Sequence, residues 1–149
     1  MVHLLRTDSS NPDFQKLVKE LDKYLAVCDG DEHAFFAQYN KIDMIRHVVV
    51  AYEGETPLGC GAIKEYEAGV MEVKRMYVAP ESRGKGIASL VLEELENWAR
   101  ELGSSKCILE TGIKQSEAIG LYKKSGYSII SNYGQYAGVA ISVCFEKVL

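Results

Sequence analysis

The chain has 149 residues, of which 47% are hydrophobic and 26% are charged, and its formal net charge is -4. These values are typical of one globular domain that buries a core without metal ions or disulfides, so we expect residues 1–149 to form a single domain. The acidic balance argues against a nucleic-acid partner. The sequence shows neither a signal peptide nor an apolar run of about 20 residues, so we expect a cytoplasmic protein with no membrane partner.

The N-terminal part of the sequence shows one strand and two helices. The segment HLLR reads as a short strand. Residues 12–27 place apolar side chains at helical spacing after the capping residues and proline of DSSNPDF, which predicts an amphipathic helix. The segment EHAFFAQYN predicts a second, short helix that carries Phe35, Phe36 and Tyr39.

The middle of the sequence changes from a helical to a strand period. RHVVVAY and PLGCGAIKEY read as strands joined by the turn EGETP, and AGVMEVKRMYV reads as a third strand. A loop with two glycines then leads into a long helix that ends at Gly103. The apolar stripe of this helix predicts that one side of it is buried, and it consists of Ile87, Val91, Leu95, Trp98 and Leu102.

The C-terminal part alternates strand and helix again. KCILETG is a predicted strand, SEAIGLYKKSG a short helix, and YSIIS and VAISVCFEKV two strands joined by the tyrosine-rich segment NYGQYAG. One strand–helix–strand crossover over residues 70–110 lies within an otherwise hairpin-rich order. The pattern predicts a domain of the α+β or α/β class with a largely antiparallel sheet.

The four cysteines and three histidines form no metal-binding pattern. Cys28, Cys60, Cys107 and Cys144 lie far apart, with no CxxC pair, and the histidines form no HExxH motif. Apolar neighbours, as in SKCILE, favour buried and reduced thiols. We therefore expect no metal site.

The loop RGKG, which precedes the long helix, has the features of an anion site. Backbone N–H groups at a helix N-terminus lack partners, and the helix dipole favours negative charge there. Gly84 and Gly86 leave the backbone accessible, and Arg83 and Lys85 add positive charge. A P-loop is excluded because Lys85 is not followed by Ser or Thr, and a dinucleotide fingerprint because Ser89 replaces its third glycine. A phosphate or pyrophosphate site is predicted, and a glycine turn that binds nothing is the alternative.

This loop resembles the acetyl-CoA-binding motif of the GNAT superfamily of N-acetyltransferases, Q/R-x-x-G-x-G/A. Here the motif runs from Arg83 to Ala88 and follows the strand VKRMYVAP. The segment QSEAIGLYKKSGY is similar to a second family motif, NxxAxxLYxxxGF, with Gln115 for asparagine and Tyr127 for phenylalanine. The resemblance covers nearly the whole chain. It implies the GNAT fold, in which about four helices flank a central mixed, mostly antiparallel sheet of six to seven strands.

The resemblance also implies acetyl-CoA as a co-substrate, without a metal. In the family, backbone groups of the strand before the loop bind the pantetheine arm and the acetyl carbonyl, while the loop amides hold the pyrophosphate. Gln115 would reach the pantetheine as the usual asparagine does. The residues implied in cofactor binding are Met76, Tyr77, Val78, Arg83, Gly84, Lys85, Gly86, Ile87, Ala88 and Gln115.

Two residues are candidates for acid–base catalysis. An amine must be neutral to attack a thioester, and deprotonating one with a pKa of about 10.4 costs roughly 4–5 kcal/mol at pH 7. The resemblance implies Tyr122 as the acid that protonates the departing thiolate, and a core aromatic residue is the alternative. Glu72 lies 11 residues before Arg83 (83 − 72 = 11), where histone-modifying members have a glutamate proposed as the base. A surface ion pair with Lys74, or a water chain as the base, are the alternatives.

Strand alternation predicts which side chains share the face of Glu72. It places Glu72, Lys74 and Met76 on one face of the strand. The opposite face would then carry Met71, Val73, Arg75 and Tyr77.

The backbone N–H of Val78 is expected to bind the thioester carbonyl oxygen, on which negative charge develops during the reaction.

The acceptor is expected to bind between the first two helices and the last hairpin, where aromatic and acidic residues suit a cationic amine. Packing at the edge of the domain is the alternative role for these residues, which are Phe35, Phe36, Tyr39, Tyr133, Tyr136, Asp29, Asp31 and Glu32.

We expect direct acetyl transfer to a primary amine of a small molecule or peptide, because no cysteine stands at an evident nucleophile position. The alternatives are a non-catalytic acyl-CoA-binding module or sensor, and transfer of a larger acyl group into a pocket near Met76 and Cys107. A homodimer is compatible with the resemblance.

Overall fold

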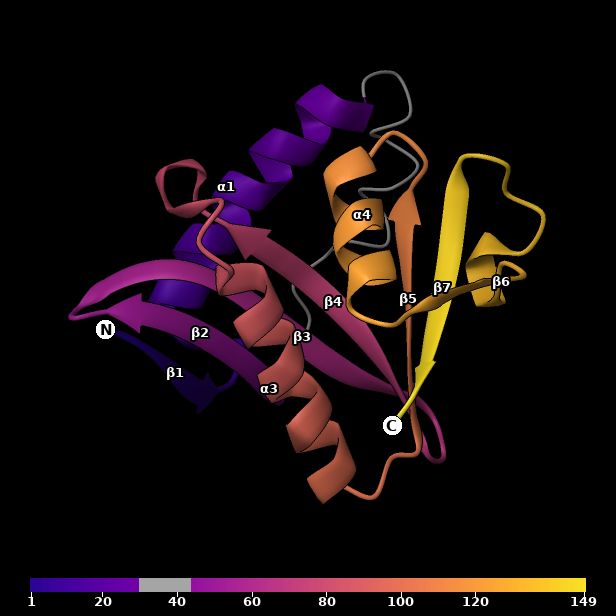
Figure 1. Cartoon of the computed structure of the whole chain (residues 1–149), viewed down its shortest axis with the longest axis horizontal. Helices are drawn as coiled ribbons and strands as arrows, with labels where there is room; N and C mark the ends of the chain where they lie inside the picture. The colour runs from indigo at the N-terminus through magenta and orange to yellow at the C-terminus, as the bar shows by residue number, and fades with distance from the viewer. Residues whose placement is uncertain (30–43) are drawn as a thin grey trace.

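A single seven-stranded sheet forms the centre of the computed structural model, which describes residues 1–29 and 44–149 (Figure 1). Its strand order is β1-β2-β3-β4-β5-β7-β6, and only β4 and β5 are parallel neighbours. The predicted mixed, mostly antiparallel sheet of six to seven strands is therefore confirmed. The strands are β1 (Val2–Thr7), β2 (His47–Glu53), β3 (Thr56–Glu67), β4 (Val70–Val78), β5 (Lys106–Gly112), β6 (Ser128–Ile130) and β7 (Ser142–Val148).

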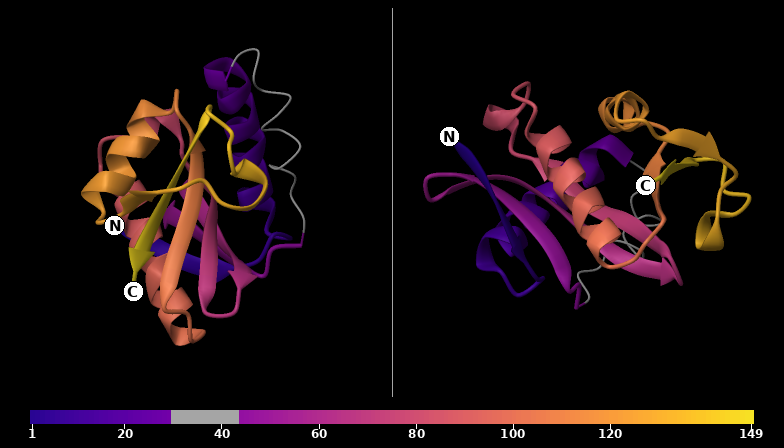
Figure 2. Two further views of the ribbon diagram at one scale, coloured as in Figure 1. Left: turned by 90° about the vertical axis from the view of Figure 1, so that its right-hand side faces the viewer. Right: turned by 60° about the horizontal axis from the view of Figure 1, so that its bottom comes forward.

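Three α-helices flank this sheet within the described residues. α1 (Pro12–Asp29) covers one face, and α3 (Ile87–Glu101) and α4 (Ser116–Lys124) cover the other (Figures 1 and 2). Two short 3-10 helices, η2 (Pro80–Ser82) and η3 (Gly134–Tyr136), lie in loops. The prediction of about four helices is thus corrected to three for residues 1–29 and 44–149. The helix predicted over EHAFFAQYN falls at residues 32–40, outside the described residues.

Alternation along the strands supplies two hydrophobic cores. In β2, Val49 and Ala51 belong to the core on the α3 side, whereas Val48 and Val50 belong to the core on the α1 side. All four side chains are fully buried. Burying each valine side chain contributes on the order of 1.5–3 kcal/mol, so both helix layers are held to the sheet mainly by apolar packing.

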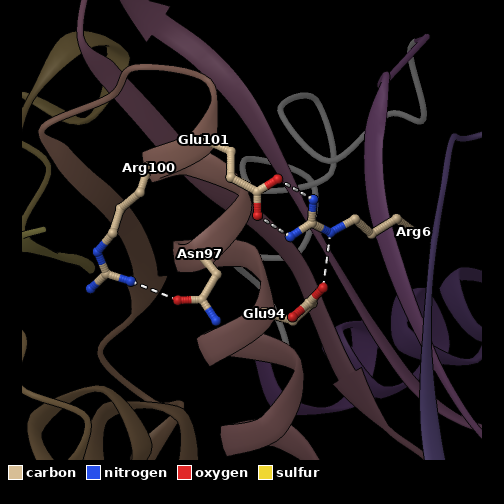
Figure 3. Close-up of polar contacts among 5 residues, drawn as sticks. All are labelled: Arg6, Glu94, Asn97, Arg100 and Glu101. Atoms are coloured by element: carbon tan, nitrogen blue, oxygen red, sulfur yellow. Dashed lines mark hydrogen bonds and ion pairs between the residues drawn. The ribbon is translucent and has the colours of Figure 1, made fainter.

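An arginine clamp also fixes α3 to the edge of the sheet. Arg6 of β1 donates from Nε to Glu94 at 2.8 Å and from both terminal nitrogens to Glu101 at 2.6 and 2.8 Å (Figure 3). Its guanidinium lies 4.9 Å from the centroid of the Trp98 ring. Such charge-assisted bonds are the stronger hydrogen bonds of proteins. Arg6 therefore illustrates an arginine whose three nitrogens are all used within the fold.

Arg75 interrupts the regular pleat of β4. Its φ of +58° lies in the left-handed region, which non-glycine residues adopt at some cost in strain. The register of β3 against β4 shifts at the same point. A bulge of this kind puts an extra residue into one strand and reverses the faces beyond it.

The bulge makes the predicted faces of β4 wrong beyond Lys74. Met76 packs with Met71 and Val73 in the core on the α3 side, and Tyr77 packs in the core on the α1 side. Arg75 pairs with Asp22 of α1. Simple alternation fails because one left-handed residue changes the phase of the strand, and no sequence period reports that change.

β4 and β5 separate beyond their short region of pairing. Their paired residues end at Glu72 and Ile108, and the two strands then diverge, with α4 lying over the opening (Figure 1). Gly59 of β3 allows α3 to begin close to the sheet, because an added Cβ there would lie 2.8 Å from the Tyr77 carbonyl oxygen and 3.2 Å from Ile87 Cγ2. The N-terminus of α3 and the ends of β4 and β5 consequently meet in one region.

Candidate functional site

A cavity of about 480 Å³ occupies this region, which is within the usual size range of ligand sites. It extends from the N-terminus of α3 to the side chains of α1 and η3, between the diverging strands. All of the predicted site residues except Lys85 line it. They are Glu72, Met76, Tyr77, Val78, Arg83, Gly84, Gly86, Ile87, Ala88, Gln115 and Tyr122.

The glycine loop presents accessible backbone at one end of the cavity. Gly84 and Gly86 have φ values of +78° and +77°, and a Cβ at either position would meet no atom within 4 Å. Gly86 is the N-cap of α3, and Leu90 is the first residue of this helix whose amide bonds a carbonyl within the described chain, at 3.1 Å to Gly86. The preceding amides and the helix dipole suit an anionic group such as a pyrophosphate.

Arg83 holds the loop against its surroundings. Its Nε donates to the carbonyl oxygen of Val78 at 3.0 Å. Its guanidinium lies 5.1 Å from the ring centroid of Tyr24 and 5.7 Å from that of Tyr77, which are cation–π distances. Lys85 is exposed and does not line the cavity, so only long-range attraction to an anion can be assigned to it.

The backbone of Val78 faces the opening between the strands. The Ala79 amide donates to the Leu58 carbonyl at 2.9 Å, which makes Gly59 and Val78 a non-hydrogen-bonded pair of the antiparallel ladder. In such a pair the N–H and C=O groups point away from the partner strand. Those of Val78 therefore point toward the side from which β5 has diverged.

Glu72 lies on the α1 side of the cavity and is only 8% exposed. The Tyr133 hydroxyl donates to its Oε2 at 2.6 Å, and Lys74 Nζ lies 3.4 Å from its Oε1. The ion pair with Lys74, which was the alternative to a catalytic role for Glu72, is therefore present, together with a bond to Tyr133 that sequence reasoning missed. Burial and the charge of Glu72 raise the pKa of Tyr133, so this phenol stays protonated and donates. Both oxygens of the carboxylate thus have a polar partner.

Tyr122 is buried in α4 and lines the cavity. The centroid of its ring lies 5.8 Å from that of Tyr127, in an edge contact, and 5.9 Å from that of Phe145, in a tilted contact. Its hydroxyl forms no hydrogen bond to another described residue, whereas the Tyr127 hydroxyl donates to buried Glu96 at 2.8 Å. Burial, assisted by the charge of Glu110, raises the pKa of Tyr122. The Tyr122 hydroxyl therefore stays protonated throughout the neutral range.

The other predicted residues differ in how the structure places them. Gln115 is buried at the N-terminus of α4 and lines the cavity, as does Tyr136 of η3. Tyr133 makes edge contacts with the rings of Tyr66 and Tyr136. The remaining acceptor-site candidates lie in the part of the sequence that the structure does not describe, and they are Phe35, Phe36, Tyr39, Asp31, Glu32 and the side chain of Asp29.

Sequence reasoning missed several charged residues that line the cavity, among them Glu110 and Arg75. Glu110 of β5 lines the cavity and accepts a hydrogen bond from Ser142 Oγ at 2.7 Å. It is the one acidic residue of the predicted strand KCILETG, and that was the available signal. Arg75 also lines the cavity, but its position depends on the bulge in β4.

Three cysteines are buried free thiols, as predicted. Burial raises the pKa of Cys60 to about 12 and those of Cys107 and Cys144 to about 11. Met76 lines the cavity and Cys107 does not, so of these two residues only Met76 could contact the larger acyl group of the alternative reaction. In residues 1–29 and 44–149, no group of His, Cys, Asp and Glu could hold a metal ion, and no helix is long and apolar enough to cross a membrane.

Comparison with known proteins gives the same class as the loop and the fold. The sequence model of the acetyltransferase (GNAT) family matches residues 7–127. The chain is 39% identical over 137 residues to an IAA acetyltransferase of Azospirillum brasilense, covering 90% of this chain and 89% of that protein. It is 33% identical to the uncharacterized N-acetyltransferase YjgM of Escherichia coli, covering 83% and 80%. The chain belongs to the GNAT acetyltransferase family and is an N-acetyltransferase.

Solved structures share the architecture. An acyl-CoA N-acyltransferase candidate from Klebsiella pneumoniae superposes with a TM-score of 0.84 at 29% identity, over 100% of this chain and 98% of that one. The PaiA N-acetyltransferase of Thermoplasma acidophilum has a TM-score of 0.73 at 17% identity, over 100% and 99%. These likenesses establish the GNAT fold.

Proposed function

We propose that this chain transfers the acetyl group of acetyl-CoA directly to a primary amine while both substrates are bound. The observation that carries the proposal is the joining, in one cavity, of the open glycine loop, the outward-facing backbone of Val78 and the hydroxyl of Tyr122. The Thermoplasma acidophilum structure contains coenzyme A, and a GNAT structure from Elizabethkingia anophelis contains acetyl-CoA, which supports the choice of co-substrate.

The residues of the cavity divide into those that hold acetyl-CoA and those that act on its thioester. The amides of residues 84–88 would bind the pyrophosphate, and the unpaired edge of β4 and the side chain of Gln115 would bind the pantetheine. The Val78 N–H would stabilise the charge that develops on the carbonyl oxygen. Tyr122 would act as a general acid and donate its proton to the sulfur of CoA as the bond between that sulfur and the acetyl carbon breaks.

Direct transfer is favoured over a covalent acyl-enzyme because the described thiols are unsuited to attack. Cys60, Cys107 and Cys144 are buried, their pKa values are raised, and none lines the cavity. A thiolate, rather than a thiol, is the nucleophile in such routes.

Initial-rate kinetics test this proposal. We expect double-reciprocal plots against acetyl-CoA at several amine concentrations to intersect, as they do when a ternary complex forms. We also expect no acetylated enzyme by mass spectrometry after incubation with acetyl-CoA alone. Parallel plots together with a stable acetyl adduct would replace direct transfer by a two-step route.

Glu72 is the residue we propose to accept the proton of the amine, and Glu72→Gln tests it. We expect kcat/KM at pH 7 to fall by about 10²-fold, within the usual contribution of a general base. The loss should shrink as the pH approaches the pKa of the amine near 10, because the neutral amine then forms without a base. The measurement is the pH profile of kcat/KM for the variant and the wild type.

Glu110→Gln serves as the comparison, because Glu110 is a further carboxylate that lines the cavity. A larger loss in Glu110→Gln than in Glu72→Gln would assign the base to Glu110. Unchanged profiles in both variants would leave a water chain as the route for the proton.

A further inference from the structure

A buried arginine that has no role in the proposed transfer lines the α1 side of the cavity. The side chain of Arg75 is 2% exposed, and its Nη2 donates to Oδ1 of Asp22 at 2.7 Å. Its Nε finds no acceptor among the described residues. A buried donor without an acceptor is uncommon and destabilising, and an absent ligand is one recognised reason for it.

Arg6 is a structural arginine of the same chain, and its hydrogen bonds can be compared with those of Arg75. Arg6 is 31% exposed, yet its three nitrogens bind the carboxylates of Glu94 and Glu101 (Figure 3). Arg75 is far more deeply buried and has one bond, to an Asp22 side chain that is 50% exposed. The charge of Arg75 is therefore the less completely compensated of the two, although it lies where compensation matters more.

The bulge in β4 explains why this guanidinium is on the α1 side at all. By alternation Arg75 would project to the face of Met71 and Val73, but its φ of +58° turns it to the face of Glu72. A left-handed arginine is strained, and such strain is found most often where function requires it. The strain thus brings a cation and a carboxylate to the same side of β4.

We propose that the acceptor amine also carries a carboxylate and that Arg75 binds this carboxylate in the cavity. A guanidinium matches a carboxylate in shape and charge, and among the described residues only Nη2 of the three Arg75 nitrogens has an acceptor. Glu72 and Glu110 provide negative charge for the ammonium end of the same molecule. The substrate class is then a small amino acid or a similar zwitterion, and this inference rests on the proposed acetyl transfer.

Matched pairs of amines test the subsite. We would measure kcat/KM at saturating acetyl-CoA for the free proteinogenic amino acids and for their carboxamides, which differ only in the negative charge. We expect at least one amino acid to exceed its amide by 10-fold or more, with the difference in KM. In Arg75→Met the ratio should fall to near one, and in Arg75→Lys, which keeps the charge without the planar fork, it should be intermediate.

Arg6→Met is the matched control, because it removes a structural arginine and should leave the acid-to-amide ratio at its wild-type value. Asp22→Asn should raise the ratio, since it removes the negative charge that competes for Arg75. A wild-type ratio near one, or a high ratio that survives in Arg75→Met, would overturn the proposal. Acetylation of polyamines or peptides with no amino acid turned over would also overturn it while leaving acetyl transfer intact.

A titration without turnover separates failure of this subsite from failure of the proposed function. N-acetyl amino acids and their amides would be titrated into the CoA-bound protein by calorimetry, with Arg75→Lys as the second protein. Tighter binding of the acids by the wild type, weakened in Arg75→Lys, supports the subsite even if no amine is acetylated. Equal binding of acids and amides contradicts it, whatever the enzyme's turnover.

Discussion

Replacing Gly86 by glutamate is expected to weaken acetyl-CoA binding by at least about 100-fold, equivalent to about 2.7 kcal/mol. Gly86 has a φ of +77° at the N-cap of α3, and the space beside its Cα is open to the cavity. A side chain there would fill the space proposed for the pyrophosphate, and a carboxylate would repel it. The dissociation constant from calorimetry is the measurement.

Gly103→Glu is the matched control for this substitution. Gly103 follows the other end of α3, has a φ of +87°, and would also place a Cβ in open space. Both variants therefore introduce backbone strain of similar size, on the order of 1–2 kcal/mol, and the same charge. If Gly103→Glu weakens binding as much as Gly86→Glu does, the effect comes from a destabilised helix and the loop is not the binding site.

Replacing Tyr122 by phenylalanine is expected to lower kcat by about 10²–10⁴-fold, the usual contribution of a positioned acid. The KM for acetyl-CoA should change little, because the ring and its packing are retained. The melting temperature should not fall, since the hydroxyl forms no hydrogen bond within the described residues. Steady-state kinetics and a thermal melt on the same sample measure both quantities.

Tyr127→Phe is the control for Tyr122→Phe, and we expect it to lower stability and leave kcat nearly unchanged. The Tyr127 hydroxyl bonds buried Glu96 and lies away from the cavity lining, so its loss should lower the free energy of unfolding by about 1–3 kcal/mol without a comparable loss of kcat. If Tyr122→Phe leaves kcat unchanged, or if the two variants behave alike, Tyr122 is a core residue and another group protonates the thiolate.

The raised pKa of Tyr122 adds a condition on pH to this assignment. A phenol donates only below its pKa, and burial raises that of Tyr122 above its ordinary value near 10. The acid form is thus complete throughout the neutral range and is lost only at strongly alkaline pH. Any decline of kcat below pH 10 should therefore persist in Tyr122→Phe.

Local features of the sequence predicted most of the residues that line this cavity. The glycine loop is a continuous segment, and its conformation depends on its own glycines and on the helix that follows directly. The same holds for α4, whose apolar positions place Tyr122 inward. The conformation of these two elements could therefore be predicted from residues that are neighbours in the sequence.

Features that depend on long-range geometry could not be predicted in this way. The bond from Tyr133 to Glu72 joins residues 61 positions apart, and nothing in either segment specifies the other. The left-handed Arg75 could not be foreseen, because an arginine gives no signal for that conformation. The faces of Arg75, Met76 and Tyr77 were consequently exchanged in the prediction, and the buried cation of the cavity went unseen.

Calorimetric titration of acetyl-CoA into the wild-type protein tests the central claim most directly. We predict saturable binding at one site per chain with a dissociation constant in the micromolar range, followed by release of CoA when an acceptor amine is added. Absence of binding by a protein that circular dichroism shows to be folded would contradict the account, because the loop, Val78 and Tyr122 would then have no thioester on which to act.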